Sequence, residues 1–186
     1  MATTTLMSFA DFERLDAGAD KIELLRGELI RVPPADCEHN EGSDVLMLEL
    51  NIAFRQNKAF SGMMAHREMG YRLTRDPDTW LQPDVSIRYP DQTKEKNPDP
   101  KAALANYYVG APLLAVEMVS GSERPRRLLA KVETYLDYGS AEVWTLYRAE
   151  RRALVYRKDA APRLETEAFR TDLLPGIEIP FDKFLL

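Results

Sequence analysis

The chain of 186 residues lacks the features of exported, disulfide-bonded or membrane-spanning proteins. It has one cysteine, Cys37, so no intrachain disulfide can form. A single cysteine fits a reducing compartment, and a cytoplasmic location is expected. The N-terminus has no basic start followed by an apolar run, so no signal peptide is expected. No segment approaches the roughly 20 apolar residues of a membrane-spanning helix.

The sequence also lacks a net positive charge and several common catalytic motifs. The net charge of −5 and the pI of about 5.2 argue against a protein that coats nucleic acid by bulk electrostatics. They do not exclude a nuclease with a local basic patch, because metal-binding acids lower the net charge. Two histidines and one cysteine, widely spread, make no zinc site. Neither Gly-x-x-x-x-Gly-Lys-Ser/Thr nor Gly-x-Ser-x-Gly occurs.

What is present is the composition of an ordinary globular protein, with 45% hydrophobic and 30% charged residues. The length predicts a single domain spanning residues 1–186. The hydrophobic pattern predicts helices over 8–15, 43–56, 102–108 and 125–138, with polar loops at 35–42 and 90–101. It predicts a hairpin over 22–32 and strands over 59–66, 69–74, 82–89, 113–119, 142–147, 153–157, 163–169 and 174–180. This order indicates an α/β fold in which helices flank a central mixed β-sheet.

Two acids stand on neighbouring predicted strands. Asp84 follows Pro83 and opens an apolar strand, while Glu117 interrupts the apolar run Leu113–Val119. Burying an ionised acid without a partner costs several kcal/mol, so Glu117 requires a cation, a hydrogen-bond donor or a metal. Two interpretations remain open: a structural ion pair with a basic residue, and a pair of acids used for metal binding or acid–base chemistry.

The helix after the second strand carries basic residues beside its apolar stripe. Lys131 lies on the flank of that stripe, and Arg124 and Arg127 share this flanking face. A lysine there can reach the site and hold a water or a phosphate, and the arginines can contact a phosphate backbone. A solvated basic face is the alternative for the arginines. Two carboxylates would bind Mg²⁺ or Mn²⁺, which activates a water for phosphodiester hydrolysis.

These residues occur in segments that resemble, in order, the Uma-two family of endonucleases. The segments are Glu23–Leu29, Gln82–Ser86, Val116–Ser120, Lys131–Gly139 and Glu142–Trp144. The family belongs to the PD-(D/E)xK, or restriction-endonuclease-like, superfamily. The resemblance extends from about residue 8 to about 180, and it implies the fold of that superfamily.

The resemblance also implies roles for individual residues. Asp84 becomes the metal-binding acid of the PD motif and Glu117 the acid of the second motif. The lysine expected two residues after Glu117 is absent, since Val119 stands there, and Lys131 from the following helix takes its place. Glu28 resembles an additional acid near the metal. One departure is that Thr145–Tyr147 ends a strand on which the family often places an acid.

The two histidines have separate interpretations. His39 matches a histidine ahead of the family's first long helix, where it could contact substrate, act as a general base or bind the metal. The alternative for His39 is a surface or capping role. His66 lies in a strand without an obvious partner and is interpreted as structural.

The sequence and the resemblance together predict a Mg²⁺-dependent DNA endonuclease that acts as a homodimer. Asp84 and Glu117 would hold the metal, Lys131 would position water or stabilise charge, and Glu28 would assist. Arg124, Arg127 and His39 would contact the substrate. One alternative is a catalytically silent module of the same fold that binds nucleic acid or a protein partner. Another is a hydrolase of RNA or of a small phosphodiester.

Overall fold

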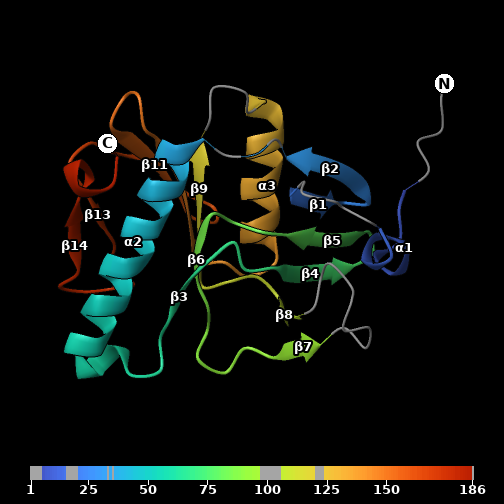
Figure 1. The fold of residues 1–186 in the computed structure, drawn as a ribbon, viewed down its shortest axis with the longest axis horizontal. Helices are drawn as coiled ribbons and strands as arrows, with labels where there is room; N and C mark the ends of the chain where they lie inside the picture. The colour runs from blue at the N-terminus through green and yellow to red at the C-terminus, as the bar shows by residue number, and fades with distance from the viewer. Residues whose placement is uncertain are drawn as a thin grey trace.

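The protein is built around a six-stranded mixed sheet, the main sheet, with strand order β12–β11–β10–β9–β6–β3. The computed structural model describes residues 6–15, 21–32, 34, 36–96, 106–119 and 124–185. Strands β9 (Leu114–Val119) and β10 (Glu142–Tyr147) are parallel, joined by a crossover that contains α3 (Pro125–Asp137). The other pairings are antiparallel and involve β3 (Ala65–Arg67), β6 (Val85–Ile87), β11 (Arg152–Tyr156) and β12 (Arg163–Glu165). The predicted α/β fold with a mixed sheet flanked by helices is confirmed (Figure 1).

A second sheet lies beside α3 and has the order β2–β1–β5–β4–β8–β7. Its first two strands form the predicted hairpin, with the turn at Arg26 and Gly27, both of which have positive φ. The strands are β1 (Lys21–Leu25), β2 (Glu28–Val32), β4 (Tyr71–Arg75), β5 (Asp78–Leu81), β7 (Lys94–Lys96) and β8 (Asn106–Val109). The short helix α1 (Phe9–Glu13) packs its Phe9 and Phe12 against this sheet and is capped by Ser8.

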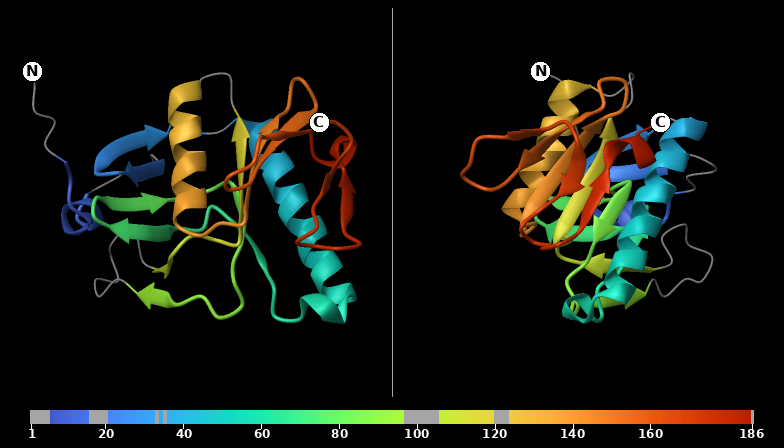
Figure 2. Two further views of the ribbon diagram at one scale, coloured as in Figure 1. Left: turned by 180° about the vertical axis from the view of Figure 1, so that it is seen from behind. Right: turned by 90° about the vertical axis from the view of Figure 1, so that its left-hand side faces the viewer.

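Helices cover both faces of the main sheet. Figure 2 shows α2 (Cys37–Gln56) and α3 on opposite sides of β9. Leu114 and Val116 of β9 pack in the core on the α2 side, whereas Ala115 packs with α3. Because side chains alternate along a strand, Glu117 faces α3. The C-terminal segment completes the α2 layer with β13 (Ala168–Arg170), β14 (Glu178–Pro180) and the 3₁₀ turn η2 (Phe181–Lys183).

Several predicted boundaries were wrong. The long helix α2 begins at Cys37, not at Ser43, because Asp36 caps it and its first turns are polar and mostly exposed. Residues 106–108 belong to β8 and not to a helix, and β7 lies within the expected loop. The segment 59–66, predicted to be one strand, instead contains the 3₁₀ turn η1 (Lys58–Phe60), followed later by β3.

No helix of the described residues is both long enough and apolar enough to cross a membrane.

Gly42, in the interior of α2, is the basis of a first prediction. Alanine normally stabilises a helix interior by about 1 kcal/mol relative to glycine. Here a Cβ at position 42 would lie 2.5 Å from the backbone oxygen of Phe184, closer than packed atoms allow. We therefore expect Gly42→Ala to lower the free energy of unfolding, by about 1 to 3 kcal/mol, in urea denaturation. Glu41→Ala, at the neighbouring exposed position, should change it by less than about 0.5 kcal/mol; stabilisation by Gly42→Ala would contradict the close approach.

Candidate active site

The pairing of β6 with β9 brings the two predicted acids together. The antiparallel register places Val85 opposite Val116, so Asp84, one residue before β6, lies beside Glu117. The backbone N–H of Met118 donates a hydrogen bond to Asp84 Oδ2 at 2.7 Å, which fixes the carboxylate at this position. Both acids are buried, with 6% and 5% of their surface exposed.

Helix α3 brings Lys131 to the same place. Leu128, Val132 and Tyr135 form its apolar stripe, so the helix lies flat on the face of the sheet from which Glu117 projects. Lys131 Nζ lies 2.7 Å from Glu117 Oε2, and the hydroxyl of Tyr135 donates to Glu117 Oε1 at 3.0 Å. The lysine thus reaches the acid from a helix and not from the strand. Tyr135 was not among the residues predicted for the site.

Strand β1 contributes two residues that sequence reasoning did not place in the site. Glu23 Oε2 lies 3.1 Å from Lys131 Nζ, and Glu23 Oε1 accepts a hydrogen bond from the backbone of Gln82. Lys21 Nζ lies 3.1 Å from Asp84 Oδ1. The sequence held a signal for Glu23, because it stands between Ile22 and Leu24 on a strand whose neighbours are buried.

His39 reaches the site from the first turn of α2. Its Nε2 lies 3.2 Å from Asp84 Oδ1, and its side chain is 15% exposed. The helix start at Cys37 makes this possible, since Asp36 accepts a hydrogen bond from the backbone N–H of His39 and orients the first turn. The side chain therefore faces Asp84, and the role of His39 in the site stays a prediction.

The remaining predicted residues lie away from these acids. Glu28 is exposed on β2, and no contact joins it to Asp84, Glu117 or Lys131 within the described residues. Arg124 is exposed at the start of α3, and Arg127 is partly exposed one turn later. We use the name acid–lysine cluster for Lys21, Glu23, His39, Asp84, Glu117, Lys131 and Tyr135.

The charges of the acid–lysine cluster do not balance. Glu23, Asp84 and Glu117 supply three carboxylates and Lys21 and Lys131 two ammonium groups, all of them buried or nearly so. Burial opposes ionisation of Asp84, but the charge of Lys21, the hydrogen bond of His39 and the charge of Lys131 together hold its pKa well below the usual range. Burial raises the pKa of Glu117 to about 7, and the negative charges of Asp84 and Glu23 add to this, against the opposing charge of Lys131.

Both lysines of the cluster have a raised pKa. Burial alone would lower the pKa of Lys131, but the charges of Glu117, Glu23 and Asp84 outweigh it and raise the pKa above its ordinary value. Lys21 follows the same pattern, with Asp84 as its main partner after burial, so its pKa is also raised. Both lysines therefore stay protonated at neutral pH, whereas Glu117, with its raised pKa, is partly protonated there.

The donor set fits a hard divalent cation. Mg²⁺ is held in proteins by one or two carboxylates together with water and phosphate oxygens, and Asp84 and Glu117 are such a pair. Within the described residues, no three His, Cys, Asp or Glu side chains are arranged to hold a metal ion. A site of this kind is thus limited to two carboxylates and would depend on water and substrate for its other ligands. A cation would also favour the ionised form of Glu117 and offset the surplus of carboxylates in the cluster.

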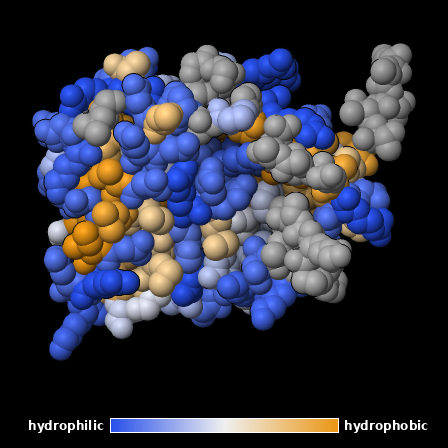
Figure 3. Space-filling model, in the orientation of Figure 1, coloured by the Kyte–Doolittle hydropathy of each residue, from blue (hydrophilic) through white to orange (hydrophobic). Residues whose placement is uncertain are grey.

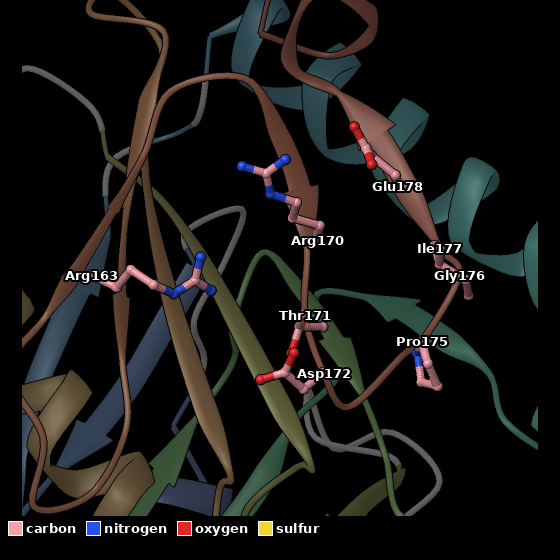
Figure 4. Close-up of a pocket in the computed structure, with 8 residues that line it drawn as sticks. All are labelled: Arg163, Arg170, Thr171, Asp172, Pro175, Gly176, Ile177 and Glu178. Atoms are coloured by element: carbon pink, nitrogen blue, oxygen red, sulfur yellow. The ribbon is translucent and has the colours of Figure 1, made fainter.

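Two hollows differ in their relation to the cluster. A small one, of about 110 Å³, lies against it and is lined by His39, Met118 and Arg148 among others. Arg148 pairs there with Asp36 and Glu38. A larger hollow, of about 500 Å³, lies between β12, β13 and β14 and contains no cluster residue (Figure 4). Its Arg163 and Arg170 both pair with the buried Glu165, so these arginines have a structural role as the partners of a buried acid.

Comparison with known proteins identifies the family. The sequence model of the Uma2 family, described as "Putative restriction endonuclease", matches residues 9–182. The chain belongs to the Uma2 family. In fold, this Uma2 protein is similar to the crystal structure of "a putative nuclease belonging to DUF820 from Anabaena variabilis", with a TM-score of 0.79 and 16% sequence identity. The likeness covers 97% of this chain and 99% of the other.

A search of curated proteins found no match. The Uma2 match confirms the resemblance seen in the sequence. The nuclease-like fold and the family together indicate a nuclease, whereas the roles of single residues stay predictions.

Proposed function

We propose that this protein is a metal-dependent endonuclease that hydrolyses phosphodiester bonds in DNA. The observation that carries the proposal is the meeting of Asp84 and Glu117 on paired strands, with Lys131 at 2.7 Å from Glu117. Two buried acids and an ammonium group at one point are the parts required to hold a divalent cation beside a phosphate.

In this proposal Asp84 and Glu117 hold Mg²⁺ or Mn²⁺. When bound, the ion would act as a Lewis acid on the phosphate and lower the pKa of a water molecule. Lys131 supplies a fixed positive charge that stabilises negative charge developing on the phosphate. Glu23 holds Lys131 in place, since it accepts from both Lys131 and the Gln82 backbone.

Lys21 and His39 have a supporting role at Asp84. Both contact Asp84 Oδ1, while the backbone of Met118 bonds Oδ2, so the carboxylate is held from both sides. The assisting acid expected at Glu28 is better assigned to Glu23, which lies inside the acid–lysine cluster. The small hollow is lined by His39, which contacts Asp84, so it is the hollow proposed to lie nearest the bound substrate.

The wider parts of the proposal concern substrate and assembly. Arg124 and Arg127 lie at the start of α3, exposed or partly exposed, where they can contact phosphates of a duplex. A homodimer suits the cutting of both strands. The lone cysteine, which cannot form an intrachain disulfide, fits a reducing compartment such as the cytoplasm.

A specific observation also supports a catalytically silent module. Each carboxylate oxygen of Asp84, Glu117 and Glu23 already contacts a donor of the protein. A cluster satisfied in this way can persist without a metal as a purely structural ion-pair network.

A nuclease assay decides between these two functions. Supercoiled plasmid, single-stranded DNA and RNA are incubated with the purified protein in Mg²⁺, in Mn²⁺ and in excess EDTA. We expect plasmid nicking in either metal and none in EDTA. Equal cleavage in EDTA would reject metal dependence, cleavage of RNA alone would reject the DNA substrate, and no cleavage of any substrate would favour the silent module.

Metal binding gives a separate prediction that needs no substrate. A metal ion at ten times its dissociation constant stabilises the folded state by about 1.4 kcal/mol. For a protein of this size, that raises the melting temperature by roughly 3 to 6 °C. We expect such a rise in the melting temperature of the wild type and none in Glu117→Gln. Glu28→Gln is the matched control, because Glu28 is exposed and should leave the rise unchanged. If Glu28→Gln lost the rise in melting temperature and Glu117→Gln kept it, the metal would bind at β2 and not at Glu117.

A further inference from the structure

The outward face of α2 carries a stripe of exposed residues with an ordered change of chemistry. At about 100° per residue, the stripe lies within an arc of roughly 80°. Along the helix it has two acids, then two large apolar residues, then a base: Glu41, Asp44, Leu48, Ile52 and Arg55. Lys58 adds a second base just beyond the helix end.

The centre of the stripe is unusually apolar for a protein surface. Leu48 is 55% exposed, Ile52 41% and the adjacent Met64 47%, and they belong to a small group of large apolar side chains exposed in the described residues. Figure 3 shows hydrophobic surface gathered over α2. A groove of about 870 Å³ runs beside them, with Met47 and Met63 in its walls. Methionine adapts its shape to an incoming side chain, which is typical of surfaces that bind a partner.

The order of charges selects the partner. If a second α2 packs antiparallel with its two-fold axis near position 50, Leu48 of one copy meets Ile52 of the other. Asp44 lies about 9 Å before that axis and Arg55 about 7.5 Å after it, so each faces the other across the pair. Glu41 lies about 13.5 Å before the axis, and Lys58, just beyond the helix end, lies on the other side of it, so this pair of opposite charges also comes from opposite ends of the stripe. The stripe is therefore complementary to itself when reversed, as a two-fold interface requires.

We propose that the stripe from Glu41 to Lys58 is the interface of a homodimer in which the two α2 helices pack antiparallel. Within each copy Asp44 pairs with Arg67 at 2.8 Å, with its side chain 53% exposed, so it keeps accessible surface for Arg55 of the second copy. Neither Glu41 nor Lys58 takes part in an ion pair within the described residues, so these two gain most from the contact. His39 lies about 180° around the helix from Leu48, so the acid–lysine cluster stays open in the dimer.

Sedimentation equilibrium with the full chain tests this interface. We expect wild type to be dimeric at about 10 to 50 μM and Leu48→Asp to be monomeric, with at least about a hundredfold weaker association, because two charges would be buried at the centre. Leu164→Asp is the matched control, since Leu164 is 54% exposed on β12, and it should stay dimeric. Circular dichroism checks that both variants keep the wild-type fold.

A charge reversal tests the antiparallel arrangement itself. Lys58→Glu should weaken the dimer, because in each of the two equivalent contacts the new glutamate faces Glu41 of the other copy; adding Glu41→Lys in the same chain should restore it. A monomeric wild type, or a dimer that Leu48→Asp leaves intact, overturns the proposal; failure of the restoration overturns the antiparallel geometry. Leu48→Asp should still nick plasmid at the wild-type rate per chain. Loss of dimer and loss of nuclease activity are therefore separate results, and neither can be mistaken for the other.

Discussion

Replacing Asp84 with asparagine is expected to lower plasmid cleavage by about a thousandfold or more. The change removes the negative charge that, on our proposal, holds the divalent cation, and a bound metal contributes several kcal/mol to the reaction. Asparagine keeps the shape and one acceptor oxygen, so the contacts with Lys21 and with the Met118 backbone cannot both be kept. The loss of one buried hydrogen bond should cost about 1 to 3 kcal/mol of unfolding free energy.

The measurement is the initial nicking rate in Mg²⁺, with circular dichroism at the same temperature to show that the variant is folded. Asp172→Asn provides the matched control, because its side chain is 92% exposed and pairs only at the surface with Arg157. It should cleave at the wild-type rate. If Asp84→Asn, folded and pure, cleaves within tenfold of wild type, the metal site lies elsewhere or the activity comes from a contaminant.

Lys131→Met is expected to have the largest effect on stability of any single substitution in the acid–lysine cluster. Lys131 is 5% exposed and contacts both Glu117 and Glu23. Methionine fills much of the same space but leaves two buried carboxylates without a cation. Breaking one side of a buried ion pair typically costs about 3 to 5 kcal/mol. Urea denaturation should show a loss of that size, and cleavage should disappear with it.

A triple variant separates lost charge from lost packing. Adding Glu117→Gln and Glu23→Gln to Lys131→Met removes the unpaired charges, so most of the stability should return while cleavage stays absent. Lys158→Met is the surface control, because Lys158 is exposed and lies 3.7 Å from the exposed Asp137; it should change the unfolding free energy by less than about 1 kcal/mol. A Lys131→Met protein as stable as wild type would show that Glu117 and Glu23 need no cation.

The sequence was informative where local chemistry and strand periodicity agreed. Asp84 and Glu117 each interrupted or opened an apolar strand, and Lys131 flanked a clear helical stripe, so their meeting could be predicted without coordinates. The mixed sheet followed from the same patterns. That the chain is one domain stays a prediction.

The sequence was less informative where long-range pairing decides the outcome. Lys21 meets Asp84, 63 residues away, because β1 and β5 pair in the second sheet, and no local pattern encodes that contact. Strand β5 was missed because it has four residues between a turn and Gln82–Pro83. The start of α2 was missed because the first two turns are polar, as suits an exposed helix end, and so resemble a loop.

The distribution of the acid–lysine cluster along the chain has a kinetic consequence. Its members come from β1, the start of α2, the residue before β6, the strand β9 and the helix α3. Glu117 and Lys131 are only 14 residues apart, but Lys21 and His39 meet Asp84, and Glu23 meets Lys131, through contacts between distant segments. Each such contact closes a long loop at a cost in chain entropy, so these contacts form late in folding. A partly folded chain, even one with intact helices and hairpins, therefore holds its acids apart. On the proposed function, a newly made chain cannot cleave DNA until its folding is complete.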